Sequence, residues 1–425
     1  MSEQQNFWER IKDKPYCDPT RRMDFVLLFD VRDGNPNGDP DAGNLPRMDP
    51  SDQHGIVTDV CIKRKIRDYL ACVLQRRIFI QSQEALNTLY FKAAREIKNY
   101  DPETDKEATE QQKEERIEGK EAVESLLAEL DQCENGSFRQ LIELSEKSEA
   151  DENAEEKRQR EFRDWLTHID VDGLEFDQEA GILRYLGEAK GKEDFRKLLS
   201  QDEFKPDEFK DKIAILADLL ATAKPAKSPK QRRARDAIKV KMCDLYDDIR
   251  LFGAVLTAGT NAGQIRGPMQ LTFARSIKPI LQQDAAITRC AITKESDRAR
   301  KETEFGRKPW LSYAAYQQYG FFNAPLAEQT CVTGNDLARF WEAVACMFPN
   351  SASASKGLMA TRDLVVFVHP NSRGIFPSHK LFERTKLLEN DRRELSFKVE
   401  DEDKDKLKAA GIEICWPLKD MWPGF

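Results

Sequence analysis

The sequence predicts an α+β protein whose core has the element order βαββαβ and is split by a long helical insertion. Three observations support this prediction: short apolar runs that end in turn residues, two segments with apolar residues at helical spacing, and a central block dominated by charge. The chain has 425 residues, of which 40% are hydrophobic and 33% charged. That length suits two or three domains, or one domain that carries a large insertion.

The first part of the core, residues 23–80, follows a polar N-terminal extension over residues 1–22. Met23–Val31 is a short apolar run and is predicted to be a buried strand. The next segment, Asp33–Arg47, holds three prolines and three glycines, which exclude a helix or a central strand. A helix is then predicted from Thr58 or Asp59 to Leu74, because its apolar residues fall on one face.

The second part of the core, residues 236–388, returns to strand-like sequence. Its predicted elements are a buried strand at Arg250–Gly259, a half-buried strand at Gln270–Ile277, a β-hairpin within residues 278–320, a helix that begins at Thr333 or Asn335, and a last strand at Arg362–Pro370. Without the insertion the order is strand, helix, strand, strand, helix, strand. This is the order of the ferredoxin-like and RNA-recognition folds. Residues 389–425 are predicted to be a C-terminal extension.

The insertion, residues 81–235, is a mixed-charge helical block that ends in a basic linker. Between positions 101 and 220 we count 36 Asp and Glu against 18 Lys and Arg, a balance of 18 − 36 = −18. The whole chain has a net charge of −8, so the remainder carries −8 + 18 = +10. A basic body is expected to face nucleic acid, and the acidic block is expected to lie away from it or against a basic partner.

The cysteines and the hydropathy indicate the compartment. Nine cysteines are scattered singly, without a CxxC pair, which is typical of reduced thiols in the cytoplasm. No apolar run approaches 18 residues, and the first residues lack the apolar region of a secretory signal. We therefore expect a cytoplasmic protein without a membrane segment, a disulfide framework or a zinc site.

The predicted helix Thr58–Leu74 carries the strongest signal for nucleic-acid binding. Its candidate contacts cluster in the first turns: Lys63, Arg64, Lys65 and Arg67. Four bases against Asp68 alone, beside a capped helix N-terminus, favour contact with an RNA backbone. The alternative is an ordinary solvated helix face.

The loop Asp33–Arg47 allows three interpretations. Its oxygen-bearing residues partly match a calcium-binding loop, but Asn44 stands where a bidentate Glu is needed, and a strand precedes it in place of a helix. It could also be a rigid turn whose Asn and Asp side chains bond their own backbone. The third interpretation is suggested only by the family resemblance described below: Asn35, Asn37 and Arg47 would donate hydrogen bonds to RNA phosphates.

Further candidate RNA contacts lie in the second part of the core. Asn261, Gln264 and Arg266 occupy a glycine-rich loop that a hairpin connection alone would also explain. The other candidates are Arg275 on the half-buried strand and three residues of the hairpin: Arg289, Arg307 and Lys308. The histidines form no metal pattern, and neither a cofactor nor a metal is expected.

Several long strings of this sequence resemble the backbone subunit of the type I-C CRISPR Cascade surveillance complex. They are FDVRDGNPNGDPDAGNLPRMDP, GIVTDVCIKRKIRDYL, FGAVLTAGTNAGQIRGPMQLTFARSI, GRKPWLSY, GFFNAPLA and HKLFERTKL. The strings fall within about Met23–Arg77 and Asp236–Leu388, which is roughly half of the chain. The insertion and the two extensions do not match that family.

The resemblance implies a hand-shaped subunit with an RNA-recognition-like palm, helical fingers and a hairpin thumb. It implies a binding scaffold rather than an enzyme, whose copies coat a guide RNA (crRNA) and present it for pairing with target DNA. The implied partners are crRNA, target DNA, further copies of the chain, the subunit at the 5′ end of the guide and a large target-recognising subunit.

Two alternatives from other classes stay open. Backbone subunits of type III complexes resemble metal-dependent ribonucleases that use a loop Asp, and Asp30, Asp33, Asp39 and Asp41 could imitate that arrangement. The other alternative is an oligomeric scaffold whose basic helix binds protein.

Overall fold

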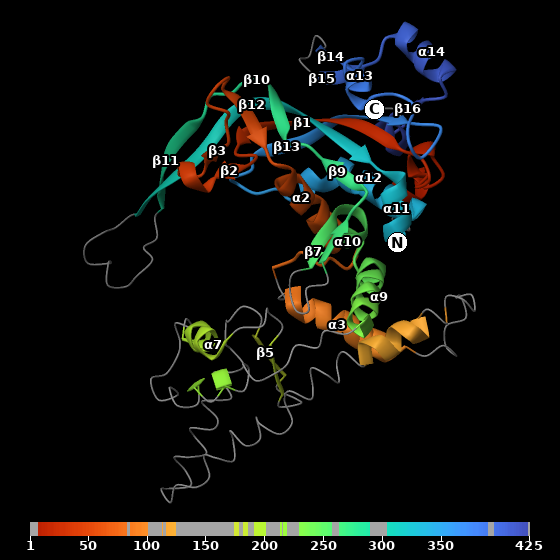
Figure 1. Ribbon diagram of the computed structural model, residues 1–425. Helices are drawn as coiled ribbons and strands as arrows, with labels where there is room; N and C mark the ends of the chain where they lie inside the picture. The colour runs from red at the N-terminus through yellow and green to blue at the C-terminus, as the bar shows by residue number, and fades with distance from the viewer. Residues whose placement is uncertain are drawn as a thin grey trace, which may run out of the picture. The chain divides into compact units, whose positions relative to one another are not determined.

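The computed structural model describes residues 7–82, 86–100, 113, 116–124, 174–177, 182–185, 191–200, 213–214, 216–218, 229–256, 263–289, 304–389 and 395–423 (Figure 1). The chain divides into two compact units. The first comprises Met1–Ile78, Tyr246–Gly253 and Arg266–Phe425, and the second comprises Phe79–Leu245 and Ala254–Ile265.

The first unit is built on an antiparallel sheet whose four main strands are β1 (Met23–Gly34), β10 (Ala274–Pro279), β12 (Glu304–Phe322) and β13 (Leu358–Val368). Their order is β13-β1-β12-β10, with β4 (His54–Val57) beyond β10 and β16 (Glu413–Cys415) beyond β13. Helices follow β1 and β12, so the order along the chain is βαββαβ and the sheet order is fourth, first, third, second. This confirms the predicted ferredoxin-like fold class.

Two helices cover one face of this sheet. Helix α2 (Asp59–Cys72) begins where Thr58 accepts a hydrogen bond from the Cys61 N–H, as predicted. Helix α12 (Gly334–Asn350) begins with a capping box between Thr333 and Asp336. Their apolar faces pack against β1 in one large core, in which the Phe25 ring meets Trp341 edge-on at 5.1 Å.

The predicted N-terminal extension packs into the same core. It holds α1 (Phe7–Ile11) and the 3₁₀ turn η1 (Pro15–Cys17). The Trp341 indole N–H donates to the Tyr16 carbonyl at 2.8 Å, and the Trp8 backbone N–H donates to Glu342 at 2.6 Å. The last helix, α15 (Pro417–Met421), also packs against α1.

A C-terminal layer covers part of the other face of the sheet. It consists of α13 (Ser378–Phe382), β14 (Lys386–Glu389), β15 (Leu395–Lys398) and α14 (Asp401–Ala409). Val26 and Leu28 of β1 pack beneath this layer, and the Tyr319 ring stacks on Phe382 at 4.5 Å. Within the described part of the chain, this layer covers one end of the face.

The predicted strand Arg250–Gly259 is wrong in its first part. Asp247–Phe252 is helix α10, and β7 (Gly253–Leu256) pairs with β8 (Gly263–Arg266) outside the central sheet. Asp248 binds the buried Arg67 and Asp247 binds the half-buried Arg76, and Gly253 adopts a φ of 76° that ends the helix. Both arginines lie far from α10 in the sequence, so the apolar pattern alone predicted the wrong element.

The predicted strand Gln270–Ile277 is divided into β9 (Met269–Leu271) and β10, which both pair with β12. Between them Thr272 donates its N–H to the Tyr319 carbonyl at 2.9 Å. The break turns Phe273 outward, where it is 55% exposed, although an unbroken half-buried strand would place it on the same face as Leu271.

The hairpin joins β11 (Gln283–Arg289) to β12, as predicted. The 19 residues of β12 pair with β11 in their first part and with β1 in their second part. One continuous strand, β12, therefore joins the hairpin to the central sheet, and the hairpin is an extension of that sheet.

The remaining short elements of the first unit are β2 (Gly38–Asp39), the 3₁₀ turn η2 (Pro40–Ala42), β3 (Leu45–Pro46) and α11 (Ala324–Thr330). The second unit contains α3 (Leu86–Lys98), β5 (Leu174–Asp177), β6 (Ile182–Tyr185), α7 (Lys192–Leu199) and α9 (Pro229–Leu245). Helices α3 and α9 pack together, with an ion pair between Lys241 and Glu96 at 3.3 Å. Most of the predicted insertion lies outside the described residues.

Candidate nucleic-acid interface

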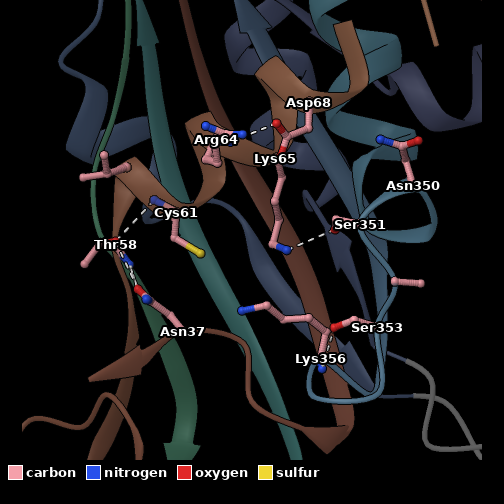
Figure 2. A pocket seen from close by; sticks show the side chains of 12 residues that line it. Asn37, Thr58, Cys61, Arg64, Lys65, Asp68, Asn350, Ser351, Ser353 and Lys356 are labelled. Atoms are coloured by element: carbon pink, nitrogen blue, oxygen red, sulfur yellow. Dashed lines mark hydrogen bonds and ion pairs between the residues drawn. The ribbon is translucent and has the colours of Figure 1, made fainter. Parts of the chain in front are cut away.

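A polar pocket of about 600 Å³ lies at one end of the central sheet, beside the start of α2. Four segments line it: the loop after β1, the first turns of α2, the end of α12 and the loop before β13. The topology explains why the loop after β1 meets the loop before β13: the two strands are antiparallel neighbours, so the end of β1 lies beside the start of β13. Figure 2 shows two lysines, Lys65 and Lys356, that point into this space. We call it the lysine pocket.

Asn37, in the loop after β1, is part of the wall of the pocket, and Asn35 lies behind it in the same loop. The Asn37 side-chain oxygen accepts hydrogen bonds from the Thr58 N–H and hydroxyl, both at 3.0 Å. Asn35 is buried and donates its side-chain amide to the Asn44 carbonyl at 2.7 Å. The Asn35 contact is of the kind that the rigid-turn interpretation predicts, whereas the Asn37 contacts fix the loop against the N-terminus of α2.

Lys65 reaches the pocket from the interior of the protein. The residue is 5% exposed, and its ammonium donates to the Ser351 hydroxyl at 3.0 Å. No carboxylate of the described residues forms an ion pair with it. Burial lowers the pKa of Lys65, and the nearby Lys356 lowers it further. An anion in the pocket would offset both effects.

Lys356 completes the pocket from the loop before β13. Its ammonium donates only a long hydrogen bond, 3.4 Å, to the Pro36 carbonyl, and within the described residues it has no carboxylate partner. Sequence reasoning missed this residue. The available signal was the small polar run SASASKG between a predicted helix and a predicted strand, at the sheet end that βαββαβ topology places beside the first loop.

Lys63 and Arg64, also predicted as RNA contacts, form ion pairs one turn away on α2. Lys63 binds Asp59 at 3.0 Å, and Arg64 binds Asp68 at 2.8 Å. Arg64 and Asp68 line the pocket, and both side chains are substantially exposed. An exposed pair of this kind contributes little to stability, so Arg64 can exchange its partner for a phosphate at small cost.

Arg67 is not part of the pocket lining. It is buried, and its guanidinium binds the buried Asp248 carboxylate of α10 at 2.8 Å. The Arg67 guanidinium also lies over the Phe252 ring at 5.2 Å. Arg67 therefore holds α10 to α2 and is not directed toward the pocket.

Two further predicted arginines are paired with acids outside the pocket lining. Arg47 lies 3.4 Å from Asp39 within the loop after β1. Arg275 is exposed and binds Asp49 at 3.0 Å and Asp52 at 2.7 Å. The first pair lies within the loop after β1, and the second joins the segment before β4 to β10.

The hairpin carries three of the predicted RNA contacts. Arg307 is 83% exposed and lies 3.1 Å from Asp284 across the hairpin. Lys308 follows it on β12, and Arg289 is the last residue of β11. Phe305 is 79% exposed near the described end of the hairpin.

The predicted glycine-rich loop is described only in part. Gln264 and Arg266 are exposed on β8, and Gly263 has a φ of 86°, which a residue with a side chain rarely adopts. Asn261 lies outside the described residues.

The acids of the loop after β1 do not converge. Asp30 is buried and binds Arg362 at 2.9 Å, and Asp39 accepts from the Asp41 N–H at 3.2 Å. Strand β1 runs to Gly34, where a calcium-binding loop needs a helix. In the part of the chain that the structure describes, no three His, Cys, Asp or Glu side chains gather as metal ligands. The same part contains no helix long and apolar enough to cross a membrane.

The arrangement at the lysine pocket suits a phosphodiester. Two ammonium groups, the first turn of a capped helix and several hydroxyls point at one space, and phosphate oxygens accept from all three kinds of donor. No base-reading pattern accompanies them, so the site offers backbone contact without sequence selection.

Comparison with protein families gives the class to which this fold and site belong. The family model described as CRISPR-associated protein Cas7 matches residues 21–129 and 187–410. The chain belongs to the Cas7 family.

Individual relatives match over less of the chain or less closely. A CRISPR-associated protein Cas7 from Haloferax volcanii is 47% identical over 49 residues, which are 12% of this chain and 14% of that protein. A chain of a solved "CRISPR RNA-guided surveillance complex, pre-nicking" has a TM-score of 0.37 and 15% identity, covering 84% of this chain and 83% of that one. A chain of a "CRISPR RNA-guided surveillance complex" has a TM-score of 0.31 and 14% identity, covering 81% and 75%.

Proposed function

We propose that this protein coats a CRISPR guide RNA as a repeated backbone subunit of a Cascade-like surveillance complex. Membership of the Cas7 family supports the proposal, and the lysine pocket is the observation that carries it. Buried Lys65 and neighbouring Lys356 form no ion pair with any described carboxylate. An RNA phosphate supplies the missing counter-charge.

The proposed mechanism is electrostatic and geometric. Lys65, Lys356 and Arg64 neutralise a phosphate at the end of the palm sheet, while Arg307 and Lys308 bind RNA from the hairpin. Contacts of this kind read the sugar-phosphate backbone, which is identical for every guide sequence. Base pairing between the guide and the target DNA then supplies the specificity.

The finer assignment follows the sequence resemblance. It is a type I-C backbone subunit that acts in the cytoplasm, without a catalytic step, cofactor or metal of its own. Its partners are crRNA, target DNA, further copies of itself, the subunit at the 5′ end of the guide and the large subunit. The motif strings quoted above support this assignment.

The test is to co-express the chain with a CRISPR array, purify it without nuclease, and sequence the RNA that survives partial ribonuclease digestion. The proposal predicts spacer-derived fragments with cuts at even intervals. A matched preparation of the double variant Lys65→Gln, Lys356→Gln should retain far less RNA. Equal retention of spacer RNA by both preparations would remove the pocket from the RNA path, and absence of RNA from the wild-type protein would reject RNA coating by this chain alone.

A further inference from the structure

Among the described residues, no layer covers one end of the sheet face opposite α2 and α12. Arg32, near the end of β1, is exposed and lies beyond the part that the C-terminal layer covers. Its partners on the neighbouring strands are Tyr313 on β12 and Leu358 on β13, which are 44% and 59% exposed. Paired residues on adjacent strands share a face, so these three side chains form one patch. We call this patch the open sheet end.

The Tyr313 ring is held in place while its surface stays accessible. Asp30 lies two residues before Arg32 on β1 and therefore on the same face of the sheet. It is buried and binds Arg362 at 2.9 Å. Burial and the Asp30 carboxylate raise the pKa of the Tyr313 hydroxyl, and Arg32 opposes that shift. The ring therefore lies beside both an acid that anchors its hydroxyl end and a cation.

Arg32 gives the patch its charge. Within the described residues no carboxylate forms an ion pair with its guanidinium. An exposed aromatic ring beside an unpaired guanidinium is complementary to a nucleotide, because the ring can stack on a base while the guanidinium binds a phosphate. A purely apolar partner would leave the Arg32 charge desolvated without a counter-ion.

The open sheet end is continuous with the lysine pocket. Strand β1 runs from Arg32 into the loop that holds Asn37, and Leu358 follows Lys356 by two residues. The two backbones touch there, since a Cβ on Gly34 would collide with the Lys356 carbonyl. The pocket and the patch thus lie on two sides of the same sheet end.

We propose that the open sheet end is a nucleobase-stacking site for single-stranded nucleic acid whose phosphates occupy the lysine pocket. Tyr313 stacks on one base and Arg32 binds an adjacent phosphate. The inference rests on the proposed function, because the pocket delivers the strand to the patch.

The test measures binding of a fluorescein-labelled single-stranded oligoribonucleotide to the full chain by anisotropy, across a series of salt concentrations. Tyr313→Ala should raise the Kd about five- to a hundredfold, and Tyr313→Phe should stay within about twofold of wild type. The slope of log K against log salt should be unchanged in Tyr313→Ala but smaller by about 0.7 in Arg32→Gln. Ultraviolet irradiation of the wild-type complex should crosslink the RNA to the peptide that holds Tyr313.

The outcomes separate this inference from the function on which it rests. If Lys356→Gln weakens RNA binding and Tyr313→Ala does not, the stacking site is rejected and the RNA-coating function stands. If wild type binds no RNA, both are rejected. If Tyr313→Ala leaves RNA affinity intact but dissociates RNA-free oligomers on sizing, the patch is an interface between copies and the stacking site is rejected.

Discussion

Lys65 and Lys356 direct their ammonium groups into one pocket (Figure 2). Lys65 is a buried residue of α2, and Lys356 lies in the loop before β13. Lys65 donates to the Ser351 hydroxyl and lies over the Phe348 ring at 5.9 Å, and Lys356 donates to the Pro36 carbonyl. Two neighbouring cations that repel each other and form no ion pair with a described carboxylate are an arrangement that an anion stabilises. The pocket is thus where changes in charge should have their largest effect on RNA binding.

Neutralising Lys356 should weaken RNA binding without unfolding the protein. We expect Lys356→Gln to raise the Kd for single-stranded RNA about tenfold, because a charge-assisted hydrogen bond to phosphate is lost. The salt slope should fall by about 0.7. Lys404→Gln, which removes an exposed lysine paired with Asp401 on α14, is the matched control and should leave both quantities unchanged. Equal Kd values for the two variants would contradict the prediction.

The Cys61 thiol can report whether the pocket is occupied. It lines the pocket, whereas Cys72, at the end of the same helix, is exposed and is not part of the lining. Bound RNA should slow alkylation of Cys61 by N-ethylmaleimide and leave the rate at Cys72 unchanged. Mass spectrometry of the two peptides after timed quenching gives both rates from one sample. Equal protection of both cysteines would point to a general change in the helix and not to an occupied pocket.

As pH rises, RNA affinity should be lost at a lower pH than deprotonation of an ordinary lysine would predict. The pKa of Lys65 lies below its usual 10.5, because burial and then Lys356 disfavour the charged form. Phosphate binding needs that charge, so affinity is fully present at neutral pH and is lost as pH rises through the lowered pKa. Binding of a 2′-O-methyl oligocytidylate, measured from neutral to alkaline pH, should show this loss in wild type and a flatter, weaker profile in Lys65→Met. Profiles of the same shape would exclude Lys65 as the titrating group.

The buried pair of Asp336 and Arg250 should control the stability of the first unit. The Arg250 guanidinium binds the Asp336 carboxylate at 3.0 and 3.2 Å, and Asp336 also closes the capping box of α12. We expect Asp336→Asn to cost about 3–5 kcal/mol, since it leaves Arg250 buried without one of its counter-ions. Urea denaturation followed by tryptophan fluorescence measures the loss, and Asp41→Asn on an exposed loop is the control.

The same pair predicts how stability depends on acid. Burial alone would raise the pKa of Asp336, but Arg250 and the hydrogen bonds from Thr333 lower it overall from 3.8. A lowered carboxyl pKa stabilises the fold above the unfolded value, and that stabilisation is lost as pH falls through the folded value. The unfolding free energy of wild type should therefore drop below about pH 4, with a shallower drop in Asp336→Asn. Parallel curves would show that other carboxylates dominate acid unfolding.

The sequence predicted the fold class because local signals agreed with the topology. Thr58 and Thr333 cap helices whose apolar faces are clear in the sequence, and Met23–Val31 has the length and composition of a central strand. The errors arose where tertiary contacts decide. Asp247 and Asp248 make α10 helical through arginines that lie far away in the sequence.

The candidate site was predicted only in part, for a related reason. The basic composition of α2 identified Lys65, but it could not distinguish Lys65 from Arg67, which is buried against Asp248. That distinction depends on which side of the helix meets α10. Lys356 needed the strand order, because only the pairing of β1 with β13 brings its loop to the pocket.

Strand β12 has a mechanical consequence for an assembly of many copies. Its 19 residues run from the hairpin into the central sheet, about 60 Å of chain with no intervening loop in the described part. Because this strand pairs with β11 at one end and with β1 at the other, the described residues contain no loop at which the hairpin could bend away from the sheet. In a row of identical subunits, the length of this one strand, and not the flexibility of a linker, would then set the repeat distance along a guide.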